Sequence, residues 1–169
     1  MPEPFRISHV VKAPIGVVWN AWTREEELLQ WWGPAGLEMS YCAADVKPGG
    51  KFHYLMTNEP DANETFEMWG AFDYLEVEPQ QRIVFVNYFS DENGGKTRHS
   101  MNPDWPLEVK SILTFVEDGD QTLLHLEGAP INAAPHEEEL YFQNLESMRI
   151  GFGGTFAQLD EHLANALEN

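Results

Sequence analysis

Arg98 and His99 are the residues best suited to chemistry, and they adjoin each other in a long connection over residues 89–106. An Arg carries a permanent positive charge with several N–H donors, and a His titrates near neutral pH. Together they could bind a carboxylate or polarise a carbonyl group, so they are the candidate catalytic residues. The alternative is that an ion pair between Arg98 and an acid of the same connection only holds it together. These acids are Asp91, Glu92 and Asp104.

The same connection also carries Met101 and Trp105. A connection of this length is usually functional or disordered, and large apolar side chains on a loop must find something to cover. We therefore expect an ordered lid over the mouth of a pocket, with both side chains contacting the ligand. The alternative is a surface hairpin tip whose Trp105 fills the core.

Two further polar candidates lie on strand-like runs. Asn87 has the same parity as Ile83 and Phe85, which places it on a mainly apolar face. It is a candidate polar group of the pocket, although backbone groups or water could also satisfy it. His53, next along the chain to Phe52, is a candidate ligand-binding residue as well.

Large apolar side chains could form the walls of such a pocket, since they offer flat surfaces to a ring or an acyl chain. The alternative for each is a place in the core. Gly151, Gly153 and Gly154 share the last helical run, where each costs about 1 kcal/mol relative to Ala. Close helix–sheet packing or room for a ligand could explain them, and we favour packing. The candidate wall residues are Trp31, Trp32, Trp69, Met148 and Phe152.

No motif points to a metal or a cofactor. His and acidic residues lack metal-ligand spacing, and neither a phosphate-binding Gly loop nor a nucleophile elbow is present. We predict no metal and no cofactor. The single Cys42 lies in a strand-like run and is expected to be an ordinary half-buried thiol.

The charge excludes several partners. Ten Lys and Arg residues against 28 Asp and Glu give a net charge of -18, which repels phosphate backbones and anionic lipids. We expect no nucleic acid and no membrane partner. Without a signal segment or an 18-residue apolar stretch, the expected location is cytoplasmic. The length of 169 residues fits one domain, residues 1–169.

The elements that must position these residues follow from periodicity. Alternation predicts a strand over 5–12, and the helical spacing of Ile15, Val18 and Trp22 predicts a helix that begins near Pro14. Thr23–Glu26 has the sequence of a capping box, which would begin a second helix.

Six more strands and a long helix follow. An apolar stripe from Leu145 to Leu163 predicts that the last helix, which begins near Pro135, covers a sheet. The order predicts an α+β fold, a curved antiparallel sheet wrapped around the C-terminal helix, with an apolar cavity where the two diverge. The predicted strands are 37–46, 51–57, 65–77, 82–89, 107–116 and 122–126.

The chain resembles the START-like, helix-grip (SRPBCC) superfamily, in its activator of Hsp90 ATPase homolog 1-like (AHSA1) branch. The resemblance extends from about residue 7 to 167 and implies the helix-grip fold. The later segments 87–106, 147–149 and 151–154 resemble a bacterial subgroup of unknown function. The motifs that carry the family resemblance are Ala13-Pro14, residues 17–23, Trp31-Trp32-Gly33-Pro34, Lys47-Pro48-Gly49-Gly50, and Pro79 with Arg82-Ile-Val-Phe85.

Three functions are therefore open. The first is a protein that binds a small hydrophobic or aromatic ligand in the cavity. The resemblance also implies an enzyme of cyclase or hydrolase type, in which Arg98, His99 and Asn87 would act, or a module that interacts with Hsp90. The helix-grip domain fills the sequence, so we expect no stimulation of an Hsp90 ATPase. A homodimer is compatible with the sequence.

Overall fold

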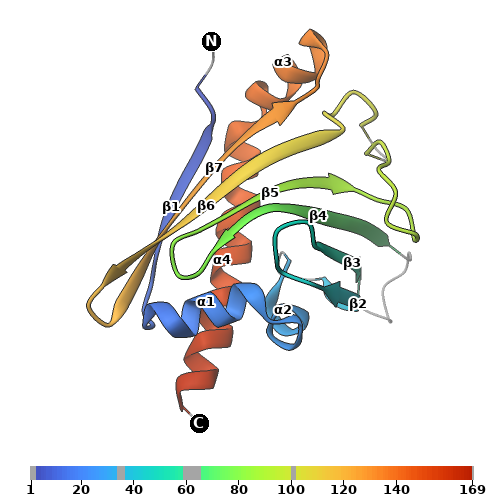
Figure 1. The fold of residues 1–169 in the computed structure, drawn as a ribbon. Helices are drawn as coiled ribbons and strands as arrows, with labels where there is room; N and C mark the ends of the chain where they lie inside the picture. Colours follow the sequence, from blue (N-terminus) through green and yellow to red (C-terminus); the bar gives the residue numbers. More distant parts are fainter. Residues whose placement is uncertain (1–2, 34–36, 59–65, 100–101, 169) are drawn as a thin grey trace.

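A seven-stranded antiparallel sheet and four helices make up the described part of the chain (Figure 1). The computed structural model describes residues 3–33, 37–58, 66–99 and 102–168. The strands are β1 (Phe5–Val11), β2 (Glu38–Ala44), β3 (Lys51–Thr57), β4 (Glu67–Glu78), β5 (Arg82–Phe89), β6 (Glu108–Asp118) and β7 (Gln121–Ile131). The helices are α1 (Ile15–Thr23), α2 (Glu25–Trp31), α3 (Pro135–Gln143) and α4 (Leu145–Glu168).

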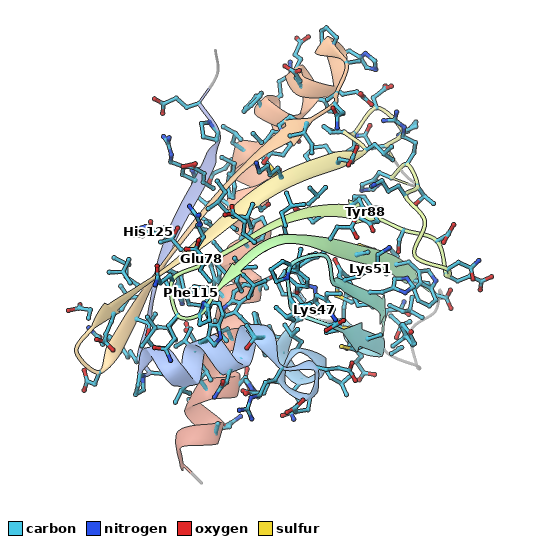
Figure 2. All side chains as sticks on the ribbon, in the orientation of Figure 1. Lys47, Lys51, Glu78, Tyr88, Phe115 and His125 are labelled. Carbon is cyan, nitrogen blue, oxygen red and sulfur yellow. The ribbon has the colours of Figure 1, made fainter. Side chains whose placement is uncertain are left out.

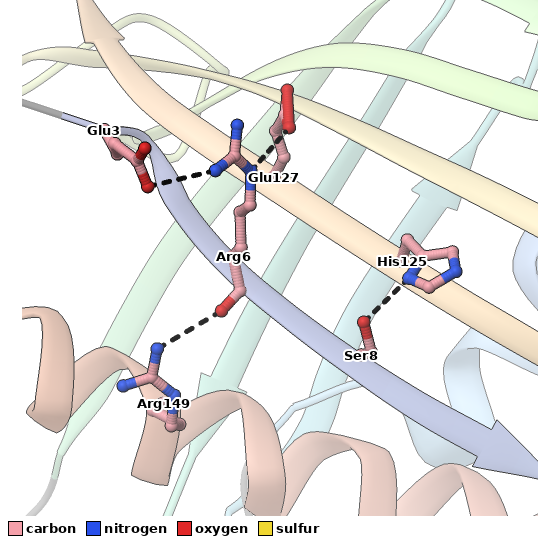
Figure 3. Close-up of polar contacts among 6 residues, drawn as sticks. All are labelled: Glu3, Arg6, Ser8, His125, Glu127 and Arg149. Atoms are coloured by element: carbon pink, nitrogen blue, oxygen red, sulfur yellow. Dashed lines mark hydrogen bonds and ion pairs between the residues drawn. The ribbon is translucent and has the colours of Figure 1, made fainter.

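The strands follow the order β1-β7-β6-β5-β4-β3-β2, so the first strand lies beside the last. Side chains on the outer face join these two strands: Arg6 Nε lies 3.1 Å from a Glu127 carboxylate oxygen, and Ser8 Oγ lies 2.7 Å from His125 Nδ1 (Figure 3). From α4, Arg149 donates a hydrogen bond to the Arg6 carbonyl oxygen at 3.3 Å. The amino-terminal strand is thus held by both the sheet and the long helix.

Helix α4 crosses the concave face of the sheet, while α1 and α2 cover the end of that face near the carboxyl terminus of α4 (Figure 1). Phe156, Leu159 and Leu163 of α4 are at most 2% exposed and lie in the main core with inward side chains of the strands. The apolar stripe seen in the sequence therefore faces the sheet. The α+β class and the curved sheet around a long C-terminal helix are confirmed.

The last helical run is two helices, where the sequence predicts one. Asn144 ends α3, and its side-chain amide donates a hydrogen bond to the Leu140 carbonyl oxygen at 2.7 Å. Asn side chains compete in this way with the backbone ladder of a helix. The break turns α3 away from the axis of α4 (Figure 1).

The expected capping box at Thr23 is wrong. Thr23 is the last residue of α1, and its hydroxyl donates a hydrogen bond to the Trp19 carbonyl oxygen at 2.7 Å. Arg24 precedes α2 without any side-chain cap. Because α1 continues to Thr23, the hydroxyl faces back along its own helix and cannot reach the amides of the next one.

The last strand is longer than predicted. Gly128 and Pro130 suggest an end near residue 126, yet β7 continues to Ile131. The pairing of β1 with β7 begins at Gly128, so the described part of β7 after Gly128 is paired with β6 alone. Pro130 is tolerated there because its missing N–H group can fall on the unpaired edge of the strand. At Gly128 a side chain would come within 3.1 Å of the Tyr141 hydroxyl.

None of the helices in the described ranges is both long enough and apolar enough to cross a bilayer.

Candidate functional site

A hollow of about 320 Å³, which we call the inner pocket, lies between the first half of α4 and the concave face of the sheet. Its walls are mainly aromatic rings and methionines from α1, the end of α2, β3, β4, β5, β7 and α4. The lining residues are Trp22, Trp32, Gly33, Tyr54, Met56, Met68, Phe72, Phe85, Asn87, Phe89, Leu126, Met148, Gly151, Phe152 and Thr155.

The first half of α4 borders this hollow, although Phe152 there stacks on Phe5 of β1 with ring centres 5.6 Å apart. A Cβ added at Gly151, Gly153 or Gly154 of this half would meet no atom within 4 Å, and Gly151 and Gly153 are exposed. The interpretation of these glycines as close helix–sheet contacts is therefore wrong. Gly151 borders the inner pocket, so its missing side chain leaves space at that wall.

Aromatic contacts fix the walls of the inner pocket. Phe72 and Phe85 stack with ring centres 4.3 Å apart and planes within 9° of parallel. Trp32 meets Phe72 edge to face at 5.2 Å and lies 5.9 Å from the Trp22 ring. Such pairs stabilise beyond the effect of burial, so they favour one arrangement of the apolar walls.

Among the polar groups of the inner pocket, more N–H donors than acceptors are left without a hydrogen-bond partner in the described residues. Trp22 Nε1 and Trp32 Nε1 are buried and have no hydrogen-bond partner among the described residues. Asn87 Oδ1 accepts a hydrogen bond from Ser111 Oγ at 3.0 Å, while its amide N–H groups have no partner in the same ranges. The Thr155 hydroxyl is used, because it donates to the Gly151 carbonyl oxygen at 3.2 Å.

The inner pocket carries no formal charge: none of its described lining residues is Asp, Glu, Lys, Arg or His. Burial raises the pKa of Tyr54 to about 12. The Trp32 N–H is close enough to the phenol to oppose this rise in part, but the contact does not reach hydrogen-bond geometry, so Trp32 Nε1 remains without an acceptor in the described part of the chain. The phenol therefore stays neutral and can still donate a hydrogen bond at physiological pH. This environment suits an uncharged ligand.

Four predicted site residues line the inner pocket, namely Trp32, Asn87, Met148 and Phe152. Trp31 does not line it. Its side chain is buried in the core, and its Nε1 donates a hydrogen bond to the Ala21 carbonyl oxygen at 2.8 Å. Trp31 thus holds α2 against α1, which is the core alternative.

His53 and Trp69 lie on the opposite, outer face of the sheet. Phe52 and Tyr54 face the core, so strand alternation turns His53 away from it. The His53 ring stacks on Trp69 at 5.0 Å, and its Nε2 lies 3.2 Å from the Asp91 carbonyl oxygen. Neither residue reaches the inner pocket, so the assignment of both to it is corrected.

The first part of the 89–106 connection also lies on the outer face. Lys51 Nζ donates a hydrogen bond to the Gly94 carbonyl oxygen at 3.1 Å and lies 5.7 Å from the Tyr88 ring (Figure 2). The backbone N–H groups of Gly95 and Asn93 bind the Asp91 carboxylate and lower its pKa. Asp91 is thus a turn residue rather than a partner of Arg98.

The second part of the connection is anchored to α3. Arg98 forms an ion pair with Glu137 rather than with the three expected acids, and it donates a second hydrogen bond to the Trp105 carbonyl oxygen at 3.4 Å. The Trp105 ring packs against Tyr141 at 5.5 Å. Neither side chain lines the inner pocket, and Met101 lies outside the described residues.

A second hollow of about 270 Å³, which we call the outer pocket, adjoins this connection. It is bordered by Arg98 and His99, and it shares Met68 and Phe89 with the inner pocket. The structure therefore separates the expected catalytic set: Asn87 borders the inner pocket, while Arg98 and His99 border the outer one.

Several lining residues were missed, although strand parity could have found them. Phe89 has the same parity as Asn87 in β5, and Tyr54 has the parity of the core residue Phe52 in β3. Trp22 lies on the apolar face of α1. The sequence does not reveal which of these inward residues border a hollow and which are closely packed.

The described residues offer neither a metal site nor a reactive cysteine. No group of three or more His, Cys, Asp or Glu side chains there could hold a metal ion. Burial and the nearby Glu25 raise the pKa of Cys42 to about 11, so its thiol is protonated at neutral pH. Cys42 is half-buried, as expected.

Comparison with known proteins agrees with this fold. Structures from Arthrobacter aurescens and Nitrosomonas europaea each share 21% identity, with TM-scores of 0.75 and 0.71. The alignments cover 96% of this chain and 86% of the first protein, and 99% of this chain and 97% of the second. The AHSA1 protein of Silicibacter pomeroyi shares 19% identity, with a TM-score of 0.68, over 98% of this chain and 99% of that protein.

Such identities show a common fold, and no curated protein matches the chain. The family model described as activator of Hsp90 ATPase homolog 1-like protein matches residues 12–164. This match spans the first helix, the whole sheet beyond β1 and most of α4. The chain therefore belongs to the activator of Hsp90 ATPase homolog 1-like family.

Proposed function

We propose that the inner pocket binds a small, uncharged, apolar or aromatic molecule that carries a hydrogen-bond acceptor such as a carbonyl oxygen. The observation that carries the proposal is the pair of buried indole N–H groups, on Trp22 and Trp32, without a partner in the described residues. Both side chains border an apolar hollow. A ligand oxygen between these walls would give such a donor its missing acceptor.

Energetics favour this type of ligand. A buried donor without an acceptor costs roughly 1–3 kcal/mol, so a ligand that satisfies it gains affinity and orientation. A ligand carboxylate would lose its hydration without meeting a cation among the lining residues. The volume of about 320 Å³ is near the lower end of ligand pockets, which favours a small molecule.

A matched pair of probes tests the proposal. 1-Acetylnaphthalene and 1-ethylnaphthalene have similar shapes, but only the ketone accepts a hydrogen bond. Calorimetric titration of the wild type should give tighter binding of the ketone. Trp22→Phe or Trp32→Phe should reduce this preference by about 2- to 10-fold, which corresponds to one hydrogen bond of roughly 0.5–1.5 kcal/mol.

The ratio of the two dissociation constants cancels any general change in pocket volume. Trp19→Phe is the matched control, because Trp19 packs against Phe115 and does not border the inner pocket. Binding of neither probe up to the solubility limit would contradict the proposed function. An unchanged preference in both tryptophan variants would contradict the role of the indole N–H groups.

A further inference from the structure

The inner and outer pockets are separated by two side chains, Met68 and Phe89, which border both. Phe89 is the last residue of β5, and Met68 is the second residue of the neighbouring β4. Gly70 of β4 is paired with Phe89, so Met68 lies just beyond this pair along β4. The separating wall is therefore one ring and one flexible thioether chain.

Phe89 is held in this wall from the outer side. The Thr97 backbone N–H donates a hydrogen bond to the Phe89 carbonyl oxygen at 2.9 Å. The His99 ring meets the Phe89 ring edge to face, with the ring centres 4.6 Å apart. Residues 97–99 thus lie on the far side of the wall, which places Arg98 and His99 beyond the inner pocket rather than inside it.

The outer pocket is more polar than the inner pocket, although Met68, Trp69 and Phe89 give it apolar walls as well. Ser90 is 7% exposed, and its buried Oγ has no hydrogen-bond partner in the described residues. Thr97 and Arg98 also border the outer pocket and add further N–H and O–H groups. Glu137 neutralises the Arg98 charge, and Glu67 adds an exposed carboxylate at the border. The local charge does not favour an anion.

We infer that the natural ligand occupies both pockets, with its apolar body in the inner pocket and an uncharged, hydrogen-bonding head in the outer pocket. The inference rests on the proposed function and extends it to an elongated, amphipathic class of molecule. The ligand passes between Met68 and Phe89, and the Ser90 hydroxyl binds its head. A hydroxyl, ester or amide head has the required chemistry.

Naphthyl ketones with a short alkyl tail test this inference by calorimetric titration. The tail ends in a hydroxyl in one probe, a methyl in the second and a carboxylate in the third. The wild type should bind the hydroxyl probe more tightly than the methyl probe by about 2- to 10-fold, the gain of one hydrogen bond. Ser90→Ala should bring this ratio to about one, while the carboxylate probe should bind most weakly.

Ser40→Ala is the control, since Ser40 is exposed on β2 and pairs with Thr57 outside both pockets. Equal binding of the hydroxyl and methyl probes to the wild type, or the same ratio in Ser90→Ala, would overturn the inference. Tightest binding of the carboxylate probe would overturn the uncharged head. In each case, binding of 1-acetylnaphthalene would leave the proposed function standing, whereas its failure would remove both.

Discussion

Glu137 is a buried carboxylate that performs two tasks at the start of α3. It accepts a hydrogen bond from the Ala134 backbone N–H at 2.8 Å, and it forms the ion pair with Arg98 of the 89–106 connection. The N–H group is the main cause that lowers the pKa of Glu137, and the guanidinium adds to it against the effect of burial. One residue thus caps a helix and fixes a distant segment.

Replacement of Glu137 should therefore show a defined pH dependence. Because the folded-state pKa lies below the ordinary 4.5, the carboxylate stabilises the protein fully above pH 4.5, and this contribution is lost as pH falls through the lowered pKa. Glu137→Gln should reduce the free energy of unfolding by about 1 kcal/mol at neutral pH. Urea titrations should show the difference from wild type vanish in acid.

Glu138→Gln is the matched control, because Glu138 is exposed in the same turn of α3. A difference between Glu137→Gln and wild type that stays constant through acid pH would contradict this account of the carboxylate.

For single residues, the sequence predicts which face of a strand a side chain occupies, but not which distant side chain it contacts. Strand alternation placed Asn87 on the inward face because a strand repeats every two residues. The ion pair of Arg98 was assigned to acids of its own connection, whereas its partner Glu137 lies 39 positions away. Such a contact depends on where α3 docks, and no local pattern contains that information.

No close contact in the described residues requires the glycines of helix α4. A Cβ at Gly153 or Gly154 would meet no atom within 4 Å, so the usual gain of an Ala in a helix should be realised. We expect Gly153→Ala and Gly154→Ala each to raise the free energy of unfolding by about 1 kcal/mol in urea titrations.

Gly70→Ala in β4 is the opposite case and the control. A Cβ there would lie 2.6 Å from the Tyr54 ring, so this variant should lose stability. A loss of stability in the two α4 variants would show that these positions are constrained in a way that open space does not explain.

Element boundaries were predictable where turn signals flank a strand. The run 51–57 follows Lys47-Pro-Gly-Gly50, and its bounds agree with β3. They were not predictable where side chains decide between continuing and stopping a helix. Asn144 bonds back to Leu140 and ends α3, whereas the same residue type could have stayed in a continuous helix.

The whole molecule carries a net charge of -18, and like charges at this density repel one another in the folded state. Dilute salt screens this repulsion, since the Debye length falls from about 30 Å at 0.01 M to about 8 Å at 0.15 M. The melting temperature should therefore rise by a few degrees from 0.01 to 0.15 M NaCl in calorimetric scans.

An equal concentration of a neutral osmolyte serves as the control for effects other than screening. A melting temperature that stays constant or falls with added salt would show that attractive ion pairs, such as Arg6 with Glu127, outweigh the general repulsion.

The arrangement of sheet and helix was predictable at this scale because the stripe on α4 and the strand-rich middle of the chain allow few ways to bury both. The inner and outer pockets were harder to predict from the sequence. Their volumes depend on how far the first half of α4 stands from the sheet, and their polarity depends on which donors remain unpaired after packing. Both are properties of the assembled structure.

The pairing of β1 with β7 has a consequence for how the chain is made. Arg6 leaves the ribosome before its neighbour Glu127, which is 121 positions further along, and β7 is the one strand beside β1 among the described residues. During translation β1 must therefore wait, with its backbone unpaired, until β7 has been synthesised. Contacts of such long sequence separation slow folding, so we expect this strand to join the sheet late.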